Sequence, residues 1–314
     1  MPTTPFSAEH EALRDVVGRL VNGPLAEVAA AAEGAATQDG RKDFAAARQV
    51  CADLGLLDLD DILAEVVVAE ELGRLRSGGL VARLLDAMLT APLALHDAAV
   101  AHTDSLTIDG DRASGALPFV VGGQEAGRCL LLARNLIVDL HGADVDVPER
   151  AHAWRGAAAA TIMLTAAPVE PANAPPTARA RAELLQAAAA VGASQRTVAE
   201  ASEYAQQREA FGRPIAKFQV NRHGLADAAT KIAAAQALVH DTAWAFNRDP
   251  GTDAAAARLY AGRVANEVAD RAVQLHGGYG YTSAFDASRA WRDAHALRAD
   301  DDDRRTRLVQ GAAP

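Results

Sequence analysis

Two short clusters in the C-terminal half combine residue types that could bind a planar compound carrying phosphate. One is QREAFGRPIAKFQ, from Gln207 to Gln219, and the other is QLHGGYGYT, from Gln274 to Thr282. An arginine pairs with phosphate through its planar fork, and an aromatic side chain packs against a ring. Glycines let backbone N–H groups approach an anion. The two clusters together indicate a binding site for a phosphate-bearing ring compound.

Each cluster alone has a simpler interpretation. REAFGRPI could be a helix end in which Gly212 caps the helix and Pro214 prevents its continuation. HGGYGY could be a glycine-capped helix end followed by a turn, with His276, like His295 further on, hydrogen-bonded to the last carbonyl groups. The two clusters occur together, however, and SRAWRDA follows the second one. Their combination favours the ligand-binding interpretation.

The composition predicts a mainly helical protein that has no nucleic-acid partner. The chain has 314 residues, of which 50% are hydrophobic and only 4% are aromatic. Alanine is frequent, and alanine is the best helix former. The formal net charge is −10 and the arginines are scattered, which argues against a surface that binds a phosphate backbone.

The cysteines and the apolar runs indicate a cytoplasmic protein. Cys51 and Cys129 lie far apart and have no metal-ligand spacing, so we expect buried thiols, no metal site and a reducing compartment. The first residues, MPTTPFSAEHEALRD, lack the pattern of a signal peptide. No apolar run reaches the ~18 residues of a membrane span, so we expect no membrane partner.

Periodicity along the chain predicts three domains. Residues 1–99 read as an N-terminal helical domain that starts at the helix cap Ser7, and residues 100–175 as a reduced β domain with a hairpin turn at Asp109–Gly110. Residues 176–314 read as a C-terminal bundle of four helices. The expected bundle helices run from about 178 to 207, 219 to 246, 253 to 276 and 285 to 310. The run Asp300–Asp303 beside Arg304 is typical of a solvated helix end.

At this point the sequence resembles a known family. REAFGRPIAKFQ, then AVQLHGGYGYTSAF, then SRAWRDA is similar to the C-terminal domain of the acyl-CoA dehydrogenases. SAEHEALRDVV, LGLLDL and VVVAEELGRL look like their N-terminal helical domain. The resemblance implies the family fold, FAD as cofactor, and α,β-dehydrogenation of an acyl-CoA thioester. An electron-transfer flavoprotein is the electron acceptor that it implies.

The resemblance also assigns roles to residues of the two clusters. It implies that Arg208 contacts the FAD pyrophosphate, that Phe211 packs near the flavin nucleotide, and that Gln219 hydrogen-bonds the ADP part. Gln274, Gly277 and Gly278 would line the ADP moiety. In this family these groups reach the FAD of the neighbouring subunit across a dimer interface, with Tyr279 and Tyr281 as aromatics of the interface or pocket wall.

Two departures from the family pattern concern the flavin ring and the catalytic base. The Thr-Glu and Gly-Ser-Asp elements that touch the flavin ring are missing from Leu93 to Leu106, where LALHDAAVAHTDSL stands. The family glutamate that removes the α-proton has Asp301 at its usual position, within ADDDDRR. At the alternative position, on the first bundle helix, stands Ala182. Glu183 lies one residue further, turned by about 100°, and is expected to be a solvated carboxylate.

Four functions remain open. The preferred one is a subunit of a hetero-oligomeric acyl-CoA dehydrogenase, similar to the two-chain actinobacterial members that act on sterol-derived thioesters, in which a second subunit supplies the base. The others are a self-sufficient homo-oligomeric acyl-CoA dehydrogenase and a non-catalytic structural paralogue. A flavin monooxygenase or oxidase on the same fold is a further alternative.

Overall fold

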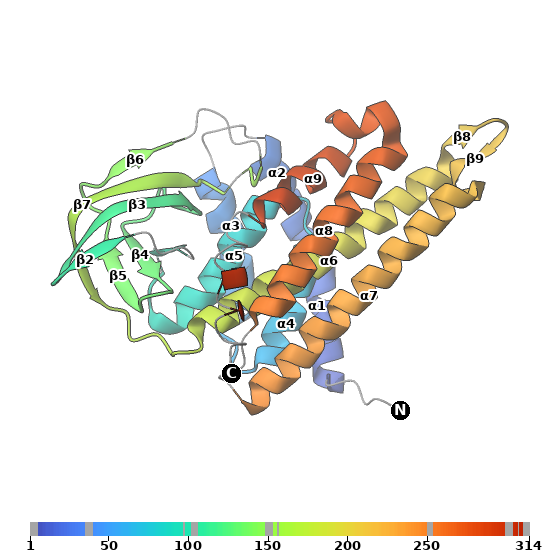
Figure 1. The fold of residues 1–314 in the computed structure, drawn as a ribbon. Coiled ribbons are helices and arrows are strands. Elements are labelled where there is room, and N and C mark those ends of the chain that lie inside the picture. The colour runs from blue at the N-terminus through green and yellow to red at the C-terminus, as the bar shows by residue number, and fades with distance from the viewer. Residues whose placement is uncertain are drawn as a thin grey trace.

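The computed structural model describes residues 6–34, 40–96, 98–101, 106–147, 153–155, 157–249, 254–298, 304–306 and 308–309. A β-sheet lies on one side of the molecule and long helices lie on the other, with the N-terminal helices packed between and behind them (Figure 1). The sequence prediction of a mainly helical fold with a small β region is confirmed.

The N-terminal helices begin at caps that the local sequence encodes. They are α1 (Ala8–Val21), α2 (Pro24–Gly34), α3 (Gly40–Asp53), α4 (Ile62–Gly73) and α5 (Gly78–Thr90). The predicted cap Ser7 is confirmed, because its Oγ accepts a hydrogen bond from the backbone N–H of His10 at 3.4 Å. Asp61 accepts from the Leu63 N–H at 3.1 Å and caps α4 in the same way. Helix α2 was not predicted, because its small apolar residues do not recur with polar ones at helical spacing.

The sheet is mixed and is built around one long strand. Its strands are β1 (Ala98–Ala101), β2 (Thr107–Asp109), β3 (Arg112–Val120), β4 (Arg128–Leu131), β5 (Leu136–Asp139), β6 (Asp144–Asp146) and β7 (Ala160–Pro171). Their order is β1-β4-β5-β7-β3-β2, and β6 pairs with β7. Only the β1–β4 pairing among the described strands is parallel. The predicted hairpin is confirmed, since Asp109 pairs with Arg112 across the turn.

Long helices follow the sheet and lie side by side in Figure 1. They are α6 (Ala178–Gln207), α7 (Gln219–Arg248), α8 (Ala255–His276) and α9 (Ala287–Ala296). A small hairpin of β8 (Glu209–Ala210) and β9 (Arg213–Pro214) joins α6 to α7 through a turn of 3-10 helix, η2 (Ile215–Lys217). Another such turn, η3 (Gly277–Tyr281), ends α8. The first bundle helix has the predicted bounds, whereas the last is shorter than predicted.

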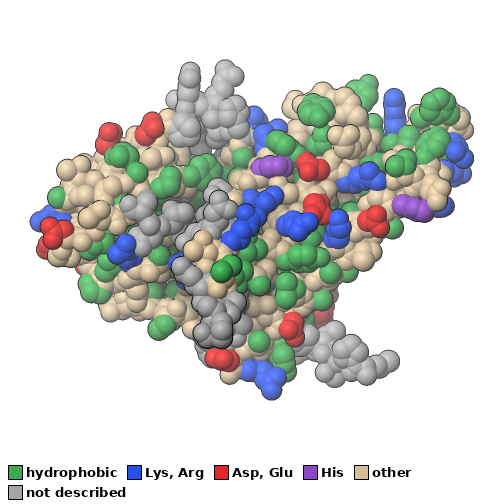
Figure 2. All heavy atoms as spheres, viewed as in Figure 1, with side chains coloured by type: hydrophobic (Ala, Val, Ile, Leu, Met, Phe, Trp, Pro, Cys, Tyr) green, Lys and Arg blue, Asp and Glu red, His purple; other side chains and the backbone are tan. Residues whose placement is uncertain are grey.

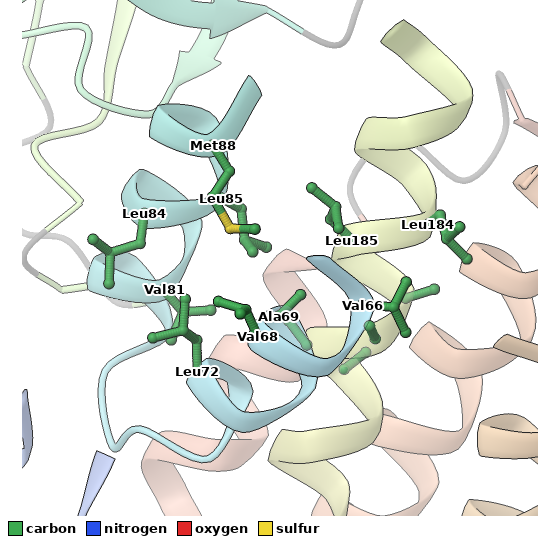
Figure 3. Packing of buried hydrophobic residues seen from close by; sticks show 14 of the residues in the cluster. Val66, Val68, Ala69, Leu72, Val81, Leu84, Leu85, Met88, Leu184 and Leu185 are labelled. Carbon is green, nitrogen blue, oxygen red and sulfur yellow. The ribbon is translucent and has the colours of Figure 1, made fainter. Parts of the chain in front are cut away.

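The main core lies where α4, α5 and α6 meet. Figure 3 shows side chains of these helices pointing toward one another, among them Leu85 of α5 and Leu185 of α6. Two glycines allow α4 and α6 to pack closely. A Cβ on Gly192 would lie 1.8 Å from the Glu70 carbonyl oxygen, and a Cβ on Gly73 would lie 2.1 Å from that of Ala189. Larger residues at either position would push the helices apart.

Two charged residues that were expected in solvent are buried. Glu183 is 2% exposed, and its Oε1 lies 3.4 Å from Arg304 Nε and 3.7 Å from Arg179 Nε. Arg304 is also 2% exposed. The prediction of a solvated Glu183 is therefore wrong, and so is that of a solvated Arg304. The two opposite charges compensate each other in the interior, and the ion pair joins segments more than a hundred residues apart in sequence.

The surface in Figure 2 carries basic and acidic side chains interspersed over the helices, without a large area of one sign on this face. Within the described part of the chain, no helix is both long enough and apolar enough to span a membrane. Cys51 and Cys129 are free and buried, as predicted.

Candidate functional site

The two sequence clusters meet at one end of the helical bundle. The side chains of Tyr204 on α6 and His276 at the end of α8 stack with ring centroids 4.0 Å apart. Phe285 packs edge-on against Tyr204 at 5.3 Å. Below them Ile215 packs against a small core that includes Leu275. These contacts join the end of α6, the turn η2 and the end of α8, and the β8–β9 hairpin lies at the same end of the molecule in Figure 1.

The residues that were assigned to the cofactor lie on this end of the bundle and face outward. We call them the bundle-end surface: Arg208, Phe211, Gln219, Gln274, Gly277 and Gly278. All six are exposed. Phe211 is 97% exposed and has a left-handed backbone φ of 51°. A left-handed φ is uncommon for a phenylalanine, and the ring is open to contact with another molecule.

The backbone of the bundle-end surface is well anchored. The Arg208 carbonyl accepts a hydrogen bond from the Ile215 N–H at 2.8 Å, which closes the hairpin. Gly277 has a φ of 58°, a conformation that favours glycine, and nothing lies within 4 Å of a Cβ placed there or on Gly278. The outer face of this turn is therefore open. His276 and His295 hydrogen-bond the Ala272 and Trp291 carbonyl groups at 2.7 Å and 2.8 Å, which is the helix-end role predicted for them.

A separate cavity lies between the sheet and the helices, and we call it the central cleft. Its volume is about 300 Å³, and its walls come from α5, β1, β3, α6, α8 and α9. Along α6 the lining runs from Gln186 to Glu200, which is roughly 20 Å at 1.5 Å per residue. Arg258 on α8 lines the cleft near Gln186, and Arg76, before α5, lines it near Glu200. We call the two ends of the cleft the Arg258 end and the Arg76 end after these residues.

The Arg76 end carries a chain of alternating ion pairs. Arg76 lies 2.8 Å from Glu200 on α6 and 2.8 Å from Asp286 before α9. Asp286 also pairs with Arg289 at 2.8 Å, and Glu200 with Arg196 at 2.7 Å. All of these groups are partly exposed. The chain of charges joins three segments that are distant in sequence, and it gives the cleft a polar rim.

The middle of the cleft is apolar and is lined by small residues. Ala189, Ala190 and Ala193 of α6 line it, and so do Ala265 and Ala269 of α8. Small side chains on both walls leave room for a wide apolar group.

The sheet side of the cleft offers apolar and aromatic surface. β1 contributes Val100 and Ala101, within the stretch expected to lie near the flavin ring, and β3 contributes residues 118–120, which Val121 follows. The Phe119 and Trp154 rings lie 5.8 Å apart in this wall. A planar ring could pack here. The cleft-lining side chains of β1 and residues 118–121 include no hydroxyl or amide group.

Asp293 of α9 connects the bundle side of the cleft to its sheet side and to α5. Its carboxylate accepts hydrogen bonds from the backbone N–H groups of Trp154 at 2.8 Å and Gly78 at 3.2 Å. Burial raises the pKa of Asp293, against the effect of these two hydrogen bonds. Glu33 of α2 lies 3.2 Å from Arg289, and burial followed by the charge of Asp293 raises its pKa to about 7. Both carboxylates are held by other groups of the protein, Asp293 by two backbone N–H groups and Glu33 by Arg289. Neither is therefore well placed to exchange a proton with a ligand.

Neither candidate base is placed in the cleft by the described residues. Asp301 lies outside them. Glu183 is described, but it does not line the cleft and is engaged with Arg304. The sequence did not predict the charged rim or Arg258. Among the charged residues that line the cleft, only Arg289 and Asp293 lie inside the SRAWRDA segment and so carried a signal.

The comparisons with known proteins agree with this layout. The family model described as acyl-CoA dehydrogenase, C-terminal domain, matches residues 179–300. The probable acyl-CoA dehydrogenase YngJ of Bacillus subtilis is 32% identical over 236 residues, which is 67% of this chain and 62% of that protein. The acyl-CoA dehydrogenase IpdE2 of Mycolicibacterium smegmatis is 39% identical over 114 residues, 36% of each chain. The caffeyl-CoA reductase–Etf complex subunit CarC of Acetobacterium woodii is 38% identical over 113 residues, which is 35% of this chain and 30% of that protein. The chain thus matches less than two thirds of the length of each of these relatives.

Solved structures share the fold over almost the whole chain. Butyryl-CoA dehydrogenase from Megasphaera elsdenii superposes with a TM-score of 0.79 at 19% identity, covering 99% of both chains. An acyl-CoA dehydrogenase from Bacillus anthracis, solved in complex with FAD, has a TM-score of 0.75 at 18% identity, covering 98% of this chain and 68% of that one. The cofactor of the family is FAD. The matched C-terminal domain, the relatives and the shared fold together show that the chain belongs to the acyl-CoA dehydrogenase family.

Proposed function

We propose that this chain is a subunit of an FAD-dependent acyl-CoA dehydrogenase, that its central cleft holds an acyl-CoA thioester, and that its bundle-end surface binds the nucleotide part of FAD together with a partner subunit. One observation carries the proposal. The bundle-end residues are all exposed at the end of the bundle, and none of them lines the chain's own cleft. This separation favours a cofactor that is shared between chains.

The bundle-end surface fits the phosphate-bearing half of FAD. Arg208 offers a guanidinium fork, Gln219 and Gln274 offer amide groups, and the open turn at Gly277 leaves backbone N–H groups approachable. Phe211 offers a ring face that is now in solvent. These are the groups that recognise a pyrophosphate and a nucleotide, and another chain that carries FAD would also cover Phe211.

The cleft fits a flavin ring by shape more than by hydrogen bonding. The Phe119–Trp154 wall suits a flat aromatic system, and it lies next to the apolar middle where an acyl group would fit. The adjoining side chains of β1 and β3 in the cleft have no polar atoms that could bond the ring edge. This favours a partner subunit as the source of the polar ring contacts.

The chemistry divides between cofactor and protein. FAD, when bound, accepts the hydride from the β-carbon of the thioester. The protein has to hold the acyl group between the α6 and α8 alanines, keep water out of the apolar middle, and present a carboxylate to the α-proton. The described carboxylates that line the cleft are Asp86, Glu200, Asp286 and Asp293. Glu200 and Asp286 are held by arginines, Asp293 is held by backbone N–H groups, and Asp86 is buried and engaged in a contact of its own. A base supplied by the partner accounts for this arrangement.

The alanine-lined middle favours a bulky substrate. Five alanines from α6 and α8 widen the cleft where longer side chains would narrow it. A sterol-derived or other alicyclic acyl group would use that width, and a second acyl-CoA dehydrogenase-like subunit would complete the site. We further propose an electron-transfer flavoprotein as the electron acceptor. The relative from Acetobacterium woodii is named as a subunit of a complex with Etf.

Flavin absorbance of the purified chain, alone and after co-expression with an acyl-CoA dehydrogenase-like partner, tests this function. The proposal expects flavin only in the assembly of two chains. One FAD per chain in the protein alone would instead support the self-sufficient homo-oligomer. The absence of flavin, and of acyl-CoA binding, in every assembly would support the structural paralogue.

The base needs its own test. Asp301→Asn should leave turnover of the two-chain assembly nearly unchanged if the partner supplies the carboxylate. A loss of several orders of magnitude in kcat would make Asp301 the base and would overturn this part of the proposal.

A further inference from the structure

An arginine that belongs to neither sequence cluster reaches the bundle end and is fixed there. Arg271 lies on α8, one turn before Gln274, and its side chain crosses to the first turn of α7. Its Nη2 donates a hydrogen bond to the Val220 carbonyl oxygen at 2.6 Å. Val220 directly follows Gln219 in the chain. Arg271 therefore links the two helix segments that carry Gln219 and Gln274, both of which belong to the bundle-end surface.

Gly224 on α7 leaves the space that this guanidinium occupies. A Cβ at position 224 would lie 1.5 Å from Arg271 Nη2, 2.0 Å from its Cζ and 2.2 Å from its Nε. A side chain at position 224 would therefore displace the guanidinium from its hydrogen bond with Val220. Glycine inside a helix is less favourable than alanine, so helix stability alone does not explain this residue. The position of the guanidinium does.

The charge of Arg271 is not neutralised within the described part of the chain. Its seen hydrogen bond goes to a neutral carbonyl oxygen, and its Nε is buried without a hydrogen-bond partner. By contrast, Arg263 on the same helix pairs with Glu267 at 2.9 Å, and the neighbouring carboxylate of Asp270 accepts a hydrogen bond from Trp291. Residues 157–249 and 254–298, which form this end of the bundle, are described without a gap.

A fixed guanidinium of this kind suits an anionic oxygen. Arg271 is half-buried, so part of it is open to a ligand at the surface. Its hydrogen bond to Val220 orients the planar fork before any ligand arrives, which lowers the entropy lost on binding. Hydrogen bonds between a guanidinium and a phosphate are short and strong because both groups are charged.

We propose that Arg271 is a further cofactor-binding residue of the bundle-end surface, and that its guanidinium binds a phosphate group in the nucleotide part of FAD. The inference rests on the proposed function, because it takes that nucleotide as the ligand. It adds a second arginine to Arg208, and it gives Gly224 the role of keeping the guanidinium in its binding position.

The test compares ADP with adenosine as competitors of FAD for the two-chain assembly freed of its flavin. ADP carries the pyrophosphate and adenosine does not, so the pair isolates the phosphate contact. We expect Arg271→Gln to weaken the binding of ADP at least about tenfold, the effect of one lost hydrogen bond between charged groups. The affinity for adenosine should stay unchanged. Arg271→Lys keeps a charge and a donor for Val220 without the fork, and should recover part of the affinity for ADP.

Two further variants separate position from charge. Gly224→Ala keeps the charge of Arg271 but fills the space of its guanidinium, so it should also weaken ADP and spare adenosine. Arg263→Gln is the matched control, since Arg263 is on the same helix, is 71% exposed and is paired with Glu267. It should leave the affinities for both competitors as they are. Thermal melts of each variant check that the bundle is folded.

The failures can be told apart. Unchanged binding of ADP in Arg271→Gln, in an assembly that still takes up FAD, overturns the inference alone. An equal loss for ADP and adenosine also overturns it, because Arg271 would then act only by placing the first turn of α7. Separation of the two chains in Arg271→Gln, with no selective loss of ADP, would make its ligand a carboxylate of the partner and overturn it as well. If the native assembly binds neither FAD nor ADP, the proposed function is overturned and the inference with it.

Discussion

Asp293 and Trp154 hold each other through two hydrogen bonds. The Trp154 backbone N–H donates to the Asp293 carboxylate at 2.8 Å, and the Trp154 indole N–H donates to the Asp293 carbonyl oxygen at 3.1 Å. The same carboxylate accepts from the Gly78 N–H at the start of α5. One residue of α9 therefore fixes the sheet side and the α5 side of the central cleft relative to the bundle.

Removal of this carboxylate should loosen the cleft. We expect Asp293→Ala to lower the free energy of unfolding by about 2 kcal/mol, because two partly buried backbone N–H groups lose their acceptor. Urea unfolding measures the change. Asp227→Ala is the control, since Asp227 is an exposed carboxylate on α7, and it should shift the unfolding midpoint little. Equal stability of the two variants would contradict the role given to Asp293.

Glu33 should make stability depend on pH near neutrality. Burial, and then the charge of Asp293, raises its pKa from 4.5 to about 7, against the attraction of Arg289 and the hydrogen bond from Ser77. The folded protein thus binds a proton that the unfolded chain releases. The stabilisation of the fold by this proton is complete below pH 4.5 and is lost as the pH rises through about 7. It amounts to at most about 3 kcal/mol, since each pKa unit corresponds to ~1.4 kcal/mol.

Thermal melts between pH 5 and pH 8 check this dependence. Glu33→Gln, which stays neutral, should flatten the decline in Tm and be more stable than the native chain at pH 8. Glu27→Gln, an exposed position on the same helix, should leave the decline as it is. A native Tm that does not fall over this range would show that Glu33 is not the titrating group described here.

Glu70 should be the most costly carboxylate to remove. It is fully buried on α4 and accepts hydrogen bonds from Gln195 at 3.2 Å, Gln236 at 2.6 Å and His240 at 3.0 Å. Burial alone would raise its pKa, but the His240 hydrogen bond and the charge of Arg14 lower it overall. Its stabilisation is therefore present above pH 4.5 and is lost as the pH falls through its lowered folded pKa.

Glu70→Ala leaves the partners from α1, α6 and α7 without their shared acceptor. We expect a loss of about 3–5 kcal/mol in the free energy of unfolding, the range observed when one member of a buried charged pair is removed. Denaturant unfolding at pH 7 measures it. Glu203→Ala, an exposed carboxylate on α6, should cost less than about 0.5 kcal/mol. A Glu70→Ala variant as stable as Glu203→Ala would mean that the network contributes little.

The sequence predicted what is encoded locally and missed what is assembled from distant segments. The Ser7 cap, the Asp109–Arg112 hairpin and the bounds of α6 depend on neighbouring residues, and all were predictable. The burial of Glu183 was missed, because its partner Arg304 is far along the chain. The rim around Arg76 was missed for the same reason, since its partners come from α6 and from the residue before α9.

The bundle-end surface gives the last prediction, which separates binding from folding. Arg208 and Phe211 are exposed, no ion pair of Arg208 is seen in the described part of the chain, and the Phe211 ring lies 6.2 Å from that of Phe218. Arg208→Ala and Phe211→Ser should therefore leave the Tm of the isolated chain within about 1 °C, while both lower the flavin content of the active assembly several-fold. Phe211→Ser also removes a bulky side chain from a left-handed position, so it should not destabilise the chain. Arg213→Ala, in the same hairpin with its guanidinium 4.3 Å from the Phe218 ring centroid, is the matched control and should keep the flavin. Flavin absorbance per assembly measures the outcome, and full retention in both variants would remove the bundle end from the cofactor site.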